Sequence, residues 1–191
     1  MSAHERIFHH EHAHKLDAPE RRRWLPPDEV VRSLALRPGM TVADIGAGTG
    51  YFTLPIARAV APGGQVYAVD LQREMLDKLR QALEEGPSAG LDIDLIEAEA
   101  TLTPLPNSSL DMVFTANVWH ELDDPKAALS EFTRLLRPAR AHRPRAHGSH
   151  RGRRPSLGRM ARAVAGYLDA HPQGPRHHPN DHREDGPLAG S

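Results

Sequence analysis

Short apolar runs alternate with amphipathic segments between residues 26 and 138. The apolar runs have the length of buried strands and lie at residues 41–45, 65–70, 91–96 and 110–116. Apolar side chains recur at the spacing of one helix face at residues 27–37, 51–60, 75–83 and 124–136. Because strands that alternate with helices form a mainly parallel sheet covered by helices, the pattern predicts an α/β fold.

The strongest local signal is the stretch from Thr41 to Gly50, where a predicted strand ends in an acid and a glycine-rich turn. Gly46, Gly48 and Gly50 permit a tight turn and a close approach of the backbone to a ligand, because glycine has no Cβ. Such turns bind nucleotide-like ligands at the carboxyl edge of a parallel sheet. The spacing is G-x-G-x-G rather than the dinucleotide pattern G-x-G-x-x-G, and Asp44 would repel a pyrophosphate. Both features favour S-adenosylmethionine, which has a positive group, over NAD.

A second acid lies at the end of the next predicted strand. Asp70 follows Gly50 by 20 residues, the position from which a carboxylate can accept hydrogen bonds from both hydroxyls of a ribose. The alternative is that Asp70 caps the helix that follows it. The ribose interpretation fits any cofactor that contains adenosine.

With these residues in view, the sequence resembles the class I S-adenosylmethionine-dependent methyltransferases of the UbiE-like, small-molecule type. The matching motifs are Val42–Gly50, Ala68–Leu71, Glu99-Ala100, Leu105-Pro106 and Asp111, and the resemblance covers residues 8–138. It implies a Rossmann-like sheet with the strand order 3-2-1-4-5-7-6, helices on both faces, and S-adenosylmethionine as the cofactor. It also implies methyl transfer to a small-molecule acceptor.

The resemblance assigns a site residue by residue. The cofactor-binding positions are Asp44, Gly46, Ala47, Gly48, Gly50, Asp70, Leu71, Met75, Glu99, Ala100 and Asn117. Glu99 and Ala100 are expected against the adenine and Asn117 beside the methionine part. Met75 is explained first as a core residue of its helix, although it is near enough to the glycine turn to touch an adenine. His120 is the candidate catalytic residue, as a general base near the acceptor. The alternative for His120 is that it only caps or braces the next helix.

The first 25 residues form a polar arm with five histidines, at positions 4, 9, 10, 12 and 14. Without acids or cysteines arranged to complete a site, we expect no metal there. In related methyltransferases this segment often folds over the cofactor, so His9, His12 or His14 could line the pocket. The run Arg21–Arg23 is interpreted as a solvated charge run.

Composition narrows the class of protein further. The chain has no cysteine, which excludes disulfides and the thiolates that capture arsenic. No apolar run reaches the roughly 20 residues of a membrane span, so we expect a cytoplasmic protein without membrane contact. The sequence does not indicate the methyl acceptor or the oligomeric state.

Residues 139–191 differ in composition from the rest. Residues 1–138 have 14 Lys and Arg against 21 acids, whereas residues 139–191 have 10 Arg, 4 acids and no Lys, Ile, Phe or Trp. The glycine pair and fifth strand of the family are missing, so the domain is expected to end near residue 138, with strand 4 at an open edge of the sheet. The rest is either a disordered basic tail, which could attract nucleic acid, or the product of a shifted reading frame, which the other frames of the gene would reveal.

Three functional alternatives follow. The first is a remnant that binds the cofactor without turnover, because the missing strands would complete the acceptor pocket. The second is an NAD-binding oxidoreductase, which the glycine spacing disfavours. The third is a nucleic-acid binder that acts through its tail, whose affinity would fall steeply with salt.

Overall fold

The computed structural model describes residues 19–87 and 90–138 of the chain. The predicted N-terminal arm up to residue 18, with all five of its histidines, and the predicted tail at 139–191 lie outside the described residues.

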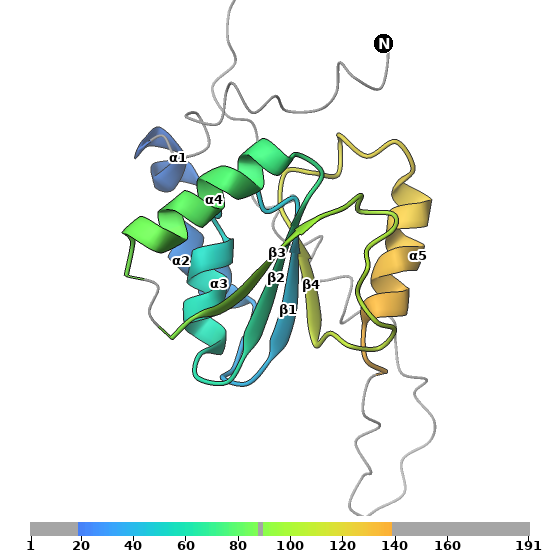
Figure 1. Ribbon diagram of the computed structural model, residues 1–191, viewed down its shortest axis with the longest axis horizontal. Coiled ribbons are helices and arrows are strands. Elements are labelled where there is room, and N and C mark those ends of the chain that lie inside the picture. Colours follow the sequence, from blue (N-terminus) through green and yellow to red (C-terminus); the bar gives the residue numbers. More distant parts are fainter. Residues whose placement is uncertain (1–18, 88–89, 139–191) are drawn as a thin grey trace, which may run out of the picture. The chain divides into compact units, whose positions relative to one another are not determined.

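The described residues form a parallel sheet of four strands in the order β3-β2-β1-β4 (Figure 1). The elements follow one another as α1 (Pro19–Trp24), α2 (Pro27–Ser33), β1 (Thr41–Ile45), α3 (Thr53–Val60), β2 (Gln65–Asp70), α4 (Arg73–Glu85), β3 (Asp92–Glu97), β4 (Met112–Thr115) and α5 (Pro125–Leu135). This order confirms the predicted α/β fold of Rossmann-like type and the predicted 3-2-1-4 arrangement of its strands.

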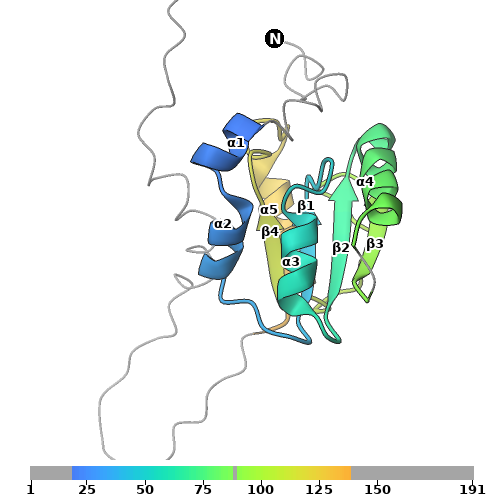
Figure 2. The same ribbon diagram turned by 90° about the vertical axis from the view of Figure 1, so that its left-hand side faces the viewer.

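Helices cover both faces of the sheet, as Figures 1 and 2 show. On one face, Ala128, Phe132 and Leu135 of α5 pack against Ala43 and Val113 of the sheet. On the other face, Leu79 of α4 packs against Ala68. The next residue, Val69, belongs to the cluster that packs with α5. Because successive side chains of a strand point to opposite faces, a strand buried on both sides reads as a continuous apolar run. That is the pattern of β1 and of the second half of β2.

The segment after α5 turns back toward β4. Leu136 forms a single parallel bridge with Leu110, and the Arg137 N–H donates to the Leu110 carbonyl at 2.8 Å. This contact lies beside the start of β4, where a fifth strand would begin. Within the described residues the pairing goes no further, and β4 is the last strand of the sheet.

Candidate functional site

A cavity of about 690 Å³ opens at the carboxyl edge of the sheet, a volume typical of sites for small ligands. Its walls come from the segments that follow all four strands, together with α1. The main contributors are Asp44 to Thr49 from the end of β1 onward, Asp70 to Gln72 from the end of β2 onward, Ala98 to Thr101 after β3, Ala116 to Val118 after β4, and Arg21 and Trp24 of α1.

The glycine turn lies on the floor of this cavity and is fixed by its neighbours. The N–H groups of Gly46 and Ala47 donate to the Val69 carbonyl at 2.8 and 3.0 Å. Gly46 has a φ of +77°, and a Cβ there would overlap the side chain of Val118. Glycine is therefore required at this position both for its backbone conformation and for close packing against the segment after β4.

Asp70 is 9% exposed, and its carboxylate interacts with the backbone N–H groups of Gly48, Leu71 and Gln72. Its Oδ2 accepts from the Gly48 N–H at 2.8 Å and its Oδ1 from the Gln72 N–H at 2.9 Å. Burial raises the pKa of Asp70, and the backbone hydrogen bonds lower it in part. The N-cap position of α4 is Gln72, so Asp70 is not the residue that caps this helix. Its carboxylate instead joins the glycine turn to the end of β2.

Asp44 is more deeply buried, at 2% exposure. Its Oδ2 accepts from Thr53 Oγ1 at 2.6 Å. Burial raises the pKa of Asp44 to about 7, the hydrogen bond from Thr53 lowers it, and the nearby charge of Asp70 raises it. A buried acid whose ionisation is also disfavoured by a neighbouring carboxylate is a place where a positive ligand group is favoured.

The structure brings together all the predicted site residues except Gly50. Those that line the cavity are Asp44, Gly46, Ala47, Gly48, Asp70, Leu71, Met75, Glu99, Ala100, Asn117 and His120. Gly50 lies outside this lining, with a φ of +91° and Leu79 of α4 directly against it.

Asn117 and His120 follow β4 at the rim. Asn117 has a φ of +61°, a left-handed conformation that asparagine tolerates better than most residues. The His120 side chain is 73% exposed, and its Nε2 lies 3.6 Å from Glu121 Oε1. It does not cap α5, because Asp124 takes that role by accepting from the N–H groups of Lys126 and Ala127 at 3.0 Å.

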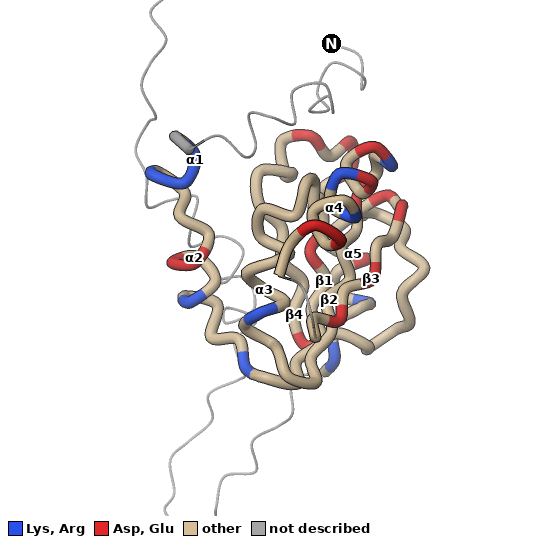
Figure 3. Tube along the Cα trace, turned by 60° about the vertical axis from the view of Figure 1, so that its left-hand side comes forward, with Lys and Arg blue, Asp and Glu red and all other residues tan. Residues whose placement is uncertain are grey.

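The interpretation of Arg21 as a solvated residue was wrong. Although α1 has three consecutive arginines (Figure 3), Arg21 is only 8% exposed, and its guanidinium lies 4.2 Å from the centre of the Tyr51 ring. The Tyr51 hydroxyl in turn donates to the Leu25 carbonyl at 2.7 Å. A six-residue helix is too short for hydrophobic periodicity to reveal its buried face. Sequence reasoning consequently also missed Trp24 in the cavity wall.

These residues fit S-adenosylmethionine. Its sulfonium and ammonium groups are positive, and the cavity contains the buried carboxyl group of Asp44, whose pKa is raised. The cavity is also large enough for an adenosine-bearing ligand.

No group of three or more His, Cys, Asp or Glu side chains in the described part of the chain is arranged to hold a metal ion. No helix among the described residues has the length and apolar character of a membrane span.

Comparison with known proteins identifies the class. The methyltransferase domain family matches residues 43–139 of this chain. The crystal structure of an S-adenosylmethionine-dependent methyltransferase from Aquifex aeolicus is similar at a TM-score of 0.64 and 31% identity, over 69% of each chain. The chain belongs to the class I S-adenosylmethionine-dependent methyltransferases, as its motifs predicted, and S-adenosylmethionine is the cofactor of this family.

Curated relatives match the same region. The ubiquinone/menaquinone biosynthesis C-methyltransferase UbiE of Hahella chejuensis is 38% identical over 104 residues, which are 54% of this chain and 41% of that protein. An uncharacterized methyltransferase of Mycobacterium tuberculosis is 39% identical over 121 residues, which are 63% and 45% of the two chains. The chain thus spans less than half the length of these two relatives.

A more distant structure shares the fold. The magnesium protoporphyrin IX methyltransferase of Synechocystis, solved with bound S-adenosylmethionine, has a TM-score of 0.50 at 24% identity, over 58% of this chain and 53% of that one.

Proposed function

We propose that this chain transfers the methyl group of S-adenosylmethionine to a small-molecule acceptor. The observation that supports this most is the meeting of the glycine turn, Asp44 and Asp70 in one cavity at the carboxyl edge of the sheet. The relative from Hahella chejuensis, named for ubiquinone and menaquinone biosynthesis, supports a small acceptor rather than a macromolecule.

Asp70 is the proposed ribose ligand. Each of its carboxylate oxygens already accepts one backbone N–H. The two oxygens together have about four lone pairs. The backbone N–H of Leu71 also acts on this carboxylate, so one acceptor position remains for a ribose hydroxyl. The backbone donors also fix the orientation of the carboxylate before any ligand arrives, which lowers the entropy cost of binding.

The other contacts are assigned along the cavity. Glu99 and Ala100, which follow β3, are placed against the adenine, and Leu71 and Met75 flank it from the start of α4. Asp44 and Asn117 are placed at the methionine end, with the backbone of Gly46, Ala47 and Gly48 beneath. The sulfonium supplies a methyl group that is transferred by direct displacement, so the protein mainly has to align donor and acceptor.

His120 is the proposed general base. It lies at the open rim of the cavity, where an acceptor can reach it, and the Glu121 carboxylate beside it can orient the imidazole. This assignment would matter for acceptors that lose a proton during methylation. The cytoplasmic location and the domain boundary near residue 138 stay predictions from composition.

A calorimetric titration with S-adenosylhomocysteine, the demethylated product, tests the site. We expect the full-length chain to bind this ligand and not NAD. Asp70→Ala should weaken the binding by about ten- to a hundredfold, because it removes a hydrogen bond to a charged group. Thermal denaturation of the variant controls for its folding. Binding of NAD, or an Asp70→Ala variant that binds like the parent, would contradict the assignment.

Methyl transfer itself is tested by incubating the chain with methyl-labelled S-adenosylmethionine and candidate acceptors, quinone precursors first. Labelled product, reduced by His120→Ala, is the expected result. Cofactor binding without transfer to any acceptor would favour the alternative of a non-catalytic member of the family.

A further inference from the structure

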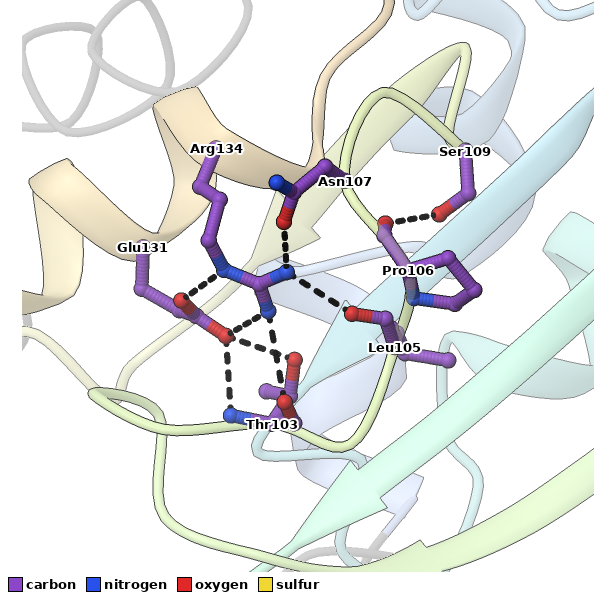
Figure 4. A network of polar contacts seen from close by, with 7 residues as sticks. All are labelled: Thr103, Leu105, Pro106, Asn107, Ser109, Glu131 and Arg134. Carbon is purple, nitrogen blue, oxygen red and sulfur yellow. Dashed lines mark hydrogen bonds and ion pairs between the residues drawn. The ribbon is translucent and has the colours of Figure 1, made fainter.

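A polar network joins α5 to the segment between β3 and β4 (Figure 4). Arg134 donates through Nε to Glu131 Oε2 at 2.7 Å and through Nη2 to Glu131 Oε1 at 2.6 Å. Glu131 Oε1 also accepts from the Thr103 N–H at 2.8 Å and from Thr103 Oγ1 at 2.7 Å. The other side of the guanidinium binds the Leu105 carbonyl, at 2.9 Å, and Asn107 Oδ1.

The acid at the centre of this network is held in its charged form. Glu131 is 6% exposed and Thr103 is 5% exposed. The hydrogen bond from Arg134 is the main cause that lowers the pKa of Glu131 to about 2, with further lowering by Thr103. Buried, charge-assisted and two-pronged hydrogen bonds are stronger and more directional than neutral ones. Thr103 is thereby fixed relative to α5.

The residues just before Thr103 form the wall of the cavity. We define the 98–102 turn as Ala98 to Leu102, in which the Leu102 N–H donates to the Glu99 carbonyl at 3.1 Å. Ala98 to Thr101 line the cavity. At its beginning the turn is attached to Asp70, because the Ala98 N–H donates to the Asp70 carbonyl at 3.0 Å. At its end it continues into Thr103 and so into the network.

Packing of large side chains contributes little to the order of this turn. Leu102 is 75% exposed, and Ala98 and Ala100 pack against the core with only their small side chains. The Glu99 side chain is exposed and accepts from Thr101 Oγ1 at 3.2 Å within the turn. The position of the Glu99 carboxylate therefore depends on the two ends of the turn, and α5 fixes one of them.

We propose that Glu131 and Arg134 are positioning residues for adenine recognition. Through Thr103 they fix the 98–102 turn, so that the Glu99 carboxylate meets the amino group of the adenine ring. The inference rests on the proposed function, since it presumes an adenosine-bearing ligand in this cavity. It adds that the selectivity of the site for adenine over a 6-oxo purine depends on a network beyond the cavity wall.

The test compares S-adenosylhomocysteine with S-inosylhomocysteine, whose purine has a carbonyl where adenine has its amino group. A carboxylate accepts from the amino group and repels the carbonyl, so we expect the parent chain to prefer S-adenosylhomocysteine by about tenfold or more. Glu131→Gln and Arg134→Gln should reduce this ratio at least about threefold. The matched control is Arg137→Gln, which breaks another arginine–carboxylate pair at the end of α5, with Asp111 at 2.6 Å, without touching the turn.

Amide hydrogen exchange without ligand gives a second readout. Exchange at residues 98–102 should rise about tenfold in both network variants, with the amides of β1 unchanged, and should not rise in Arg137→Gln. Thr103→Val, which keeps the backbone donor, should give a smaller change of the same kind and remains useful if the other variants fold poorly.

If the network has a purely structural role, Glu131→Gln and Arg134→Gln should weaken the binding of both ligands equally. The ratio of the two affinities would then be unchanged, which would overturn the inference. Unchanged exchange at residues 98–102 would overturn it as well. If the parent chain binds neither ligand, the proposed function fails, and the exchange measurement still decides separately whether the network orders the turn.

Discussion

Asp44, which is proposed to lie at the methionine end of the cofactor, is buried at an energetic cost. The carboxyl group ionises near pH 3.8 in an unfolded chain, whereas burial raises its pKa to about 7 in the folded protein. Between these two values the folded state retains a proton that the unfolded state has released. Stability therefore falls as the pH rises from 3.8 to about 7, and above 7 the full cost is present.

Replacing this acid with a neutral isostere should reveal that cost. We expect Asp44→Asn to be more stable than the parent by about 2 to 4 kcal/mol at pH 8, with the difference shrinking toward pH 4. The amide oxygen can still accept from Thr53, so the hydrogen bond of 2.6 Å need not be lost. Urea denaturation at four pH values between 5 and 8 measures the difference. A constant difference across this range would mean that Asp44 does not titrate there. The same variant should bind the cationic cofactor more weakly.

Gly50 does not line the cavity, so the cavity does not explain why this residue is glycine. The packing of the glycine turn against α4 does. A Cβ on Gly50 would overlap Cδ1 of Leu79, a side chain that is fully buried in α4. Gly63 also has a positive φ, +77°, but a Cβ there would meet no atom within 4 Å. The two glycines thus share the backbone requirement and differ in their surroundings.

This difference gives a matched pair of variants. Gly63→Ala should cost about 1 kcal/mol for the left-handed backbone, and Gly50→Ala should cost about 1 to 3 kcal/mol more because it overpacks the interface with α4. Denaturant midpoints measure both losses. Equal losses would show that Leu79 adapts, and the packing argument for Gly50 would be withdrawn.

The elements that could be predicted are those whose signals are local. β1 and the second half of β2 are buried on both faces, and each strand has an acid at or next to its carboxyl end. The resemblance to the family then supplied the strand order. The boundaries were less accurate, since the fourth strand is Met112–Thr115 rather than residues 110–116.

What the sequence did not reveal depends on contacts between distant residues. Thr103 and Glu131 are 28 positions apart, and each has an ordinary explanation by itself, one as a turn residue and the other on an amphipathic helix. Arg21 was misassigned for the same reason, because only the aromatic ring of Tyr51, 30 positions later, shows that the arginine is buried. Local periodicity contains no information about such partners.

Residues from most of the described region line one cavity. Its lining extends from Arg21 to Ala127 and includes the ends of β1 and β2 and the segments that follow β3 and β4, although the sheet itself stops at β4 within the described residues. The cavity proposed for the cofactor is thus lined by described residues without a fifth strand. A ligand that bridges these segments should stabilise them as a unit, because it binds only when the strand ends, the 98–102 turn and the glycine turn are all in place.

Thermal unfolding can measure that coupling on the full-length chain. At a hundred times its dissociation constant, S-adenosylhomocysteine should add about 2.7 kcal/mol to the free energy of unfolding, which corresponds to roughly 5 to 10 °C for a domain of this size. The shift should grow with the logarithm of ligand concentration, and it should be absent with NAD and much reduced in Asp70→Ala. A shift of equal size with NAD would point to binding through the adenosine part alone, so that Asp44 and Asn117 would have no role in choosing the cofactor. The absence of any shift would mean that the segments around the cavity do not bind as one site, and the family membership of the chain would then not extend to its activity.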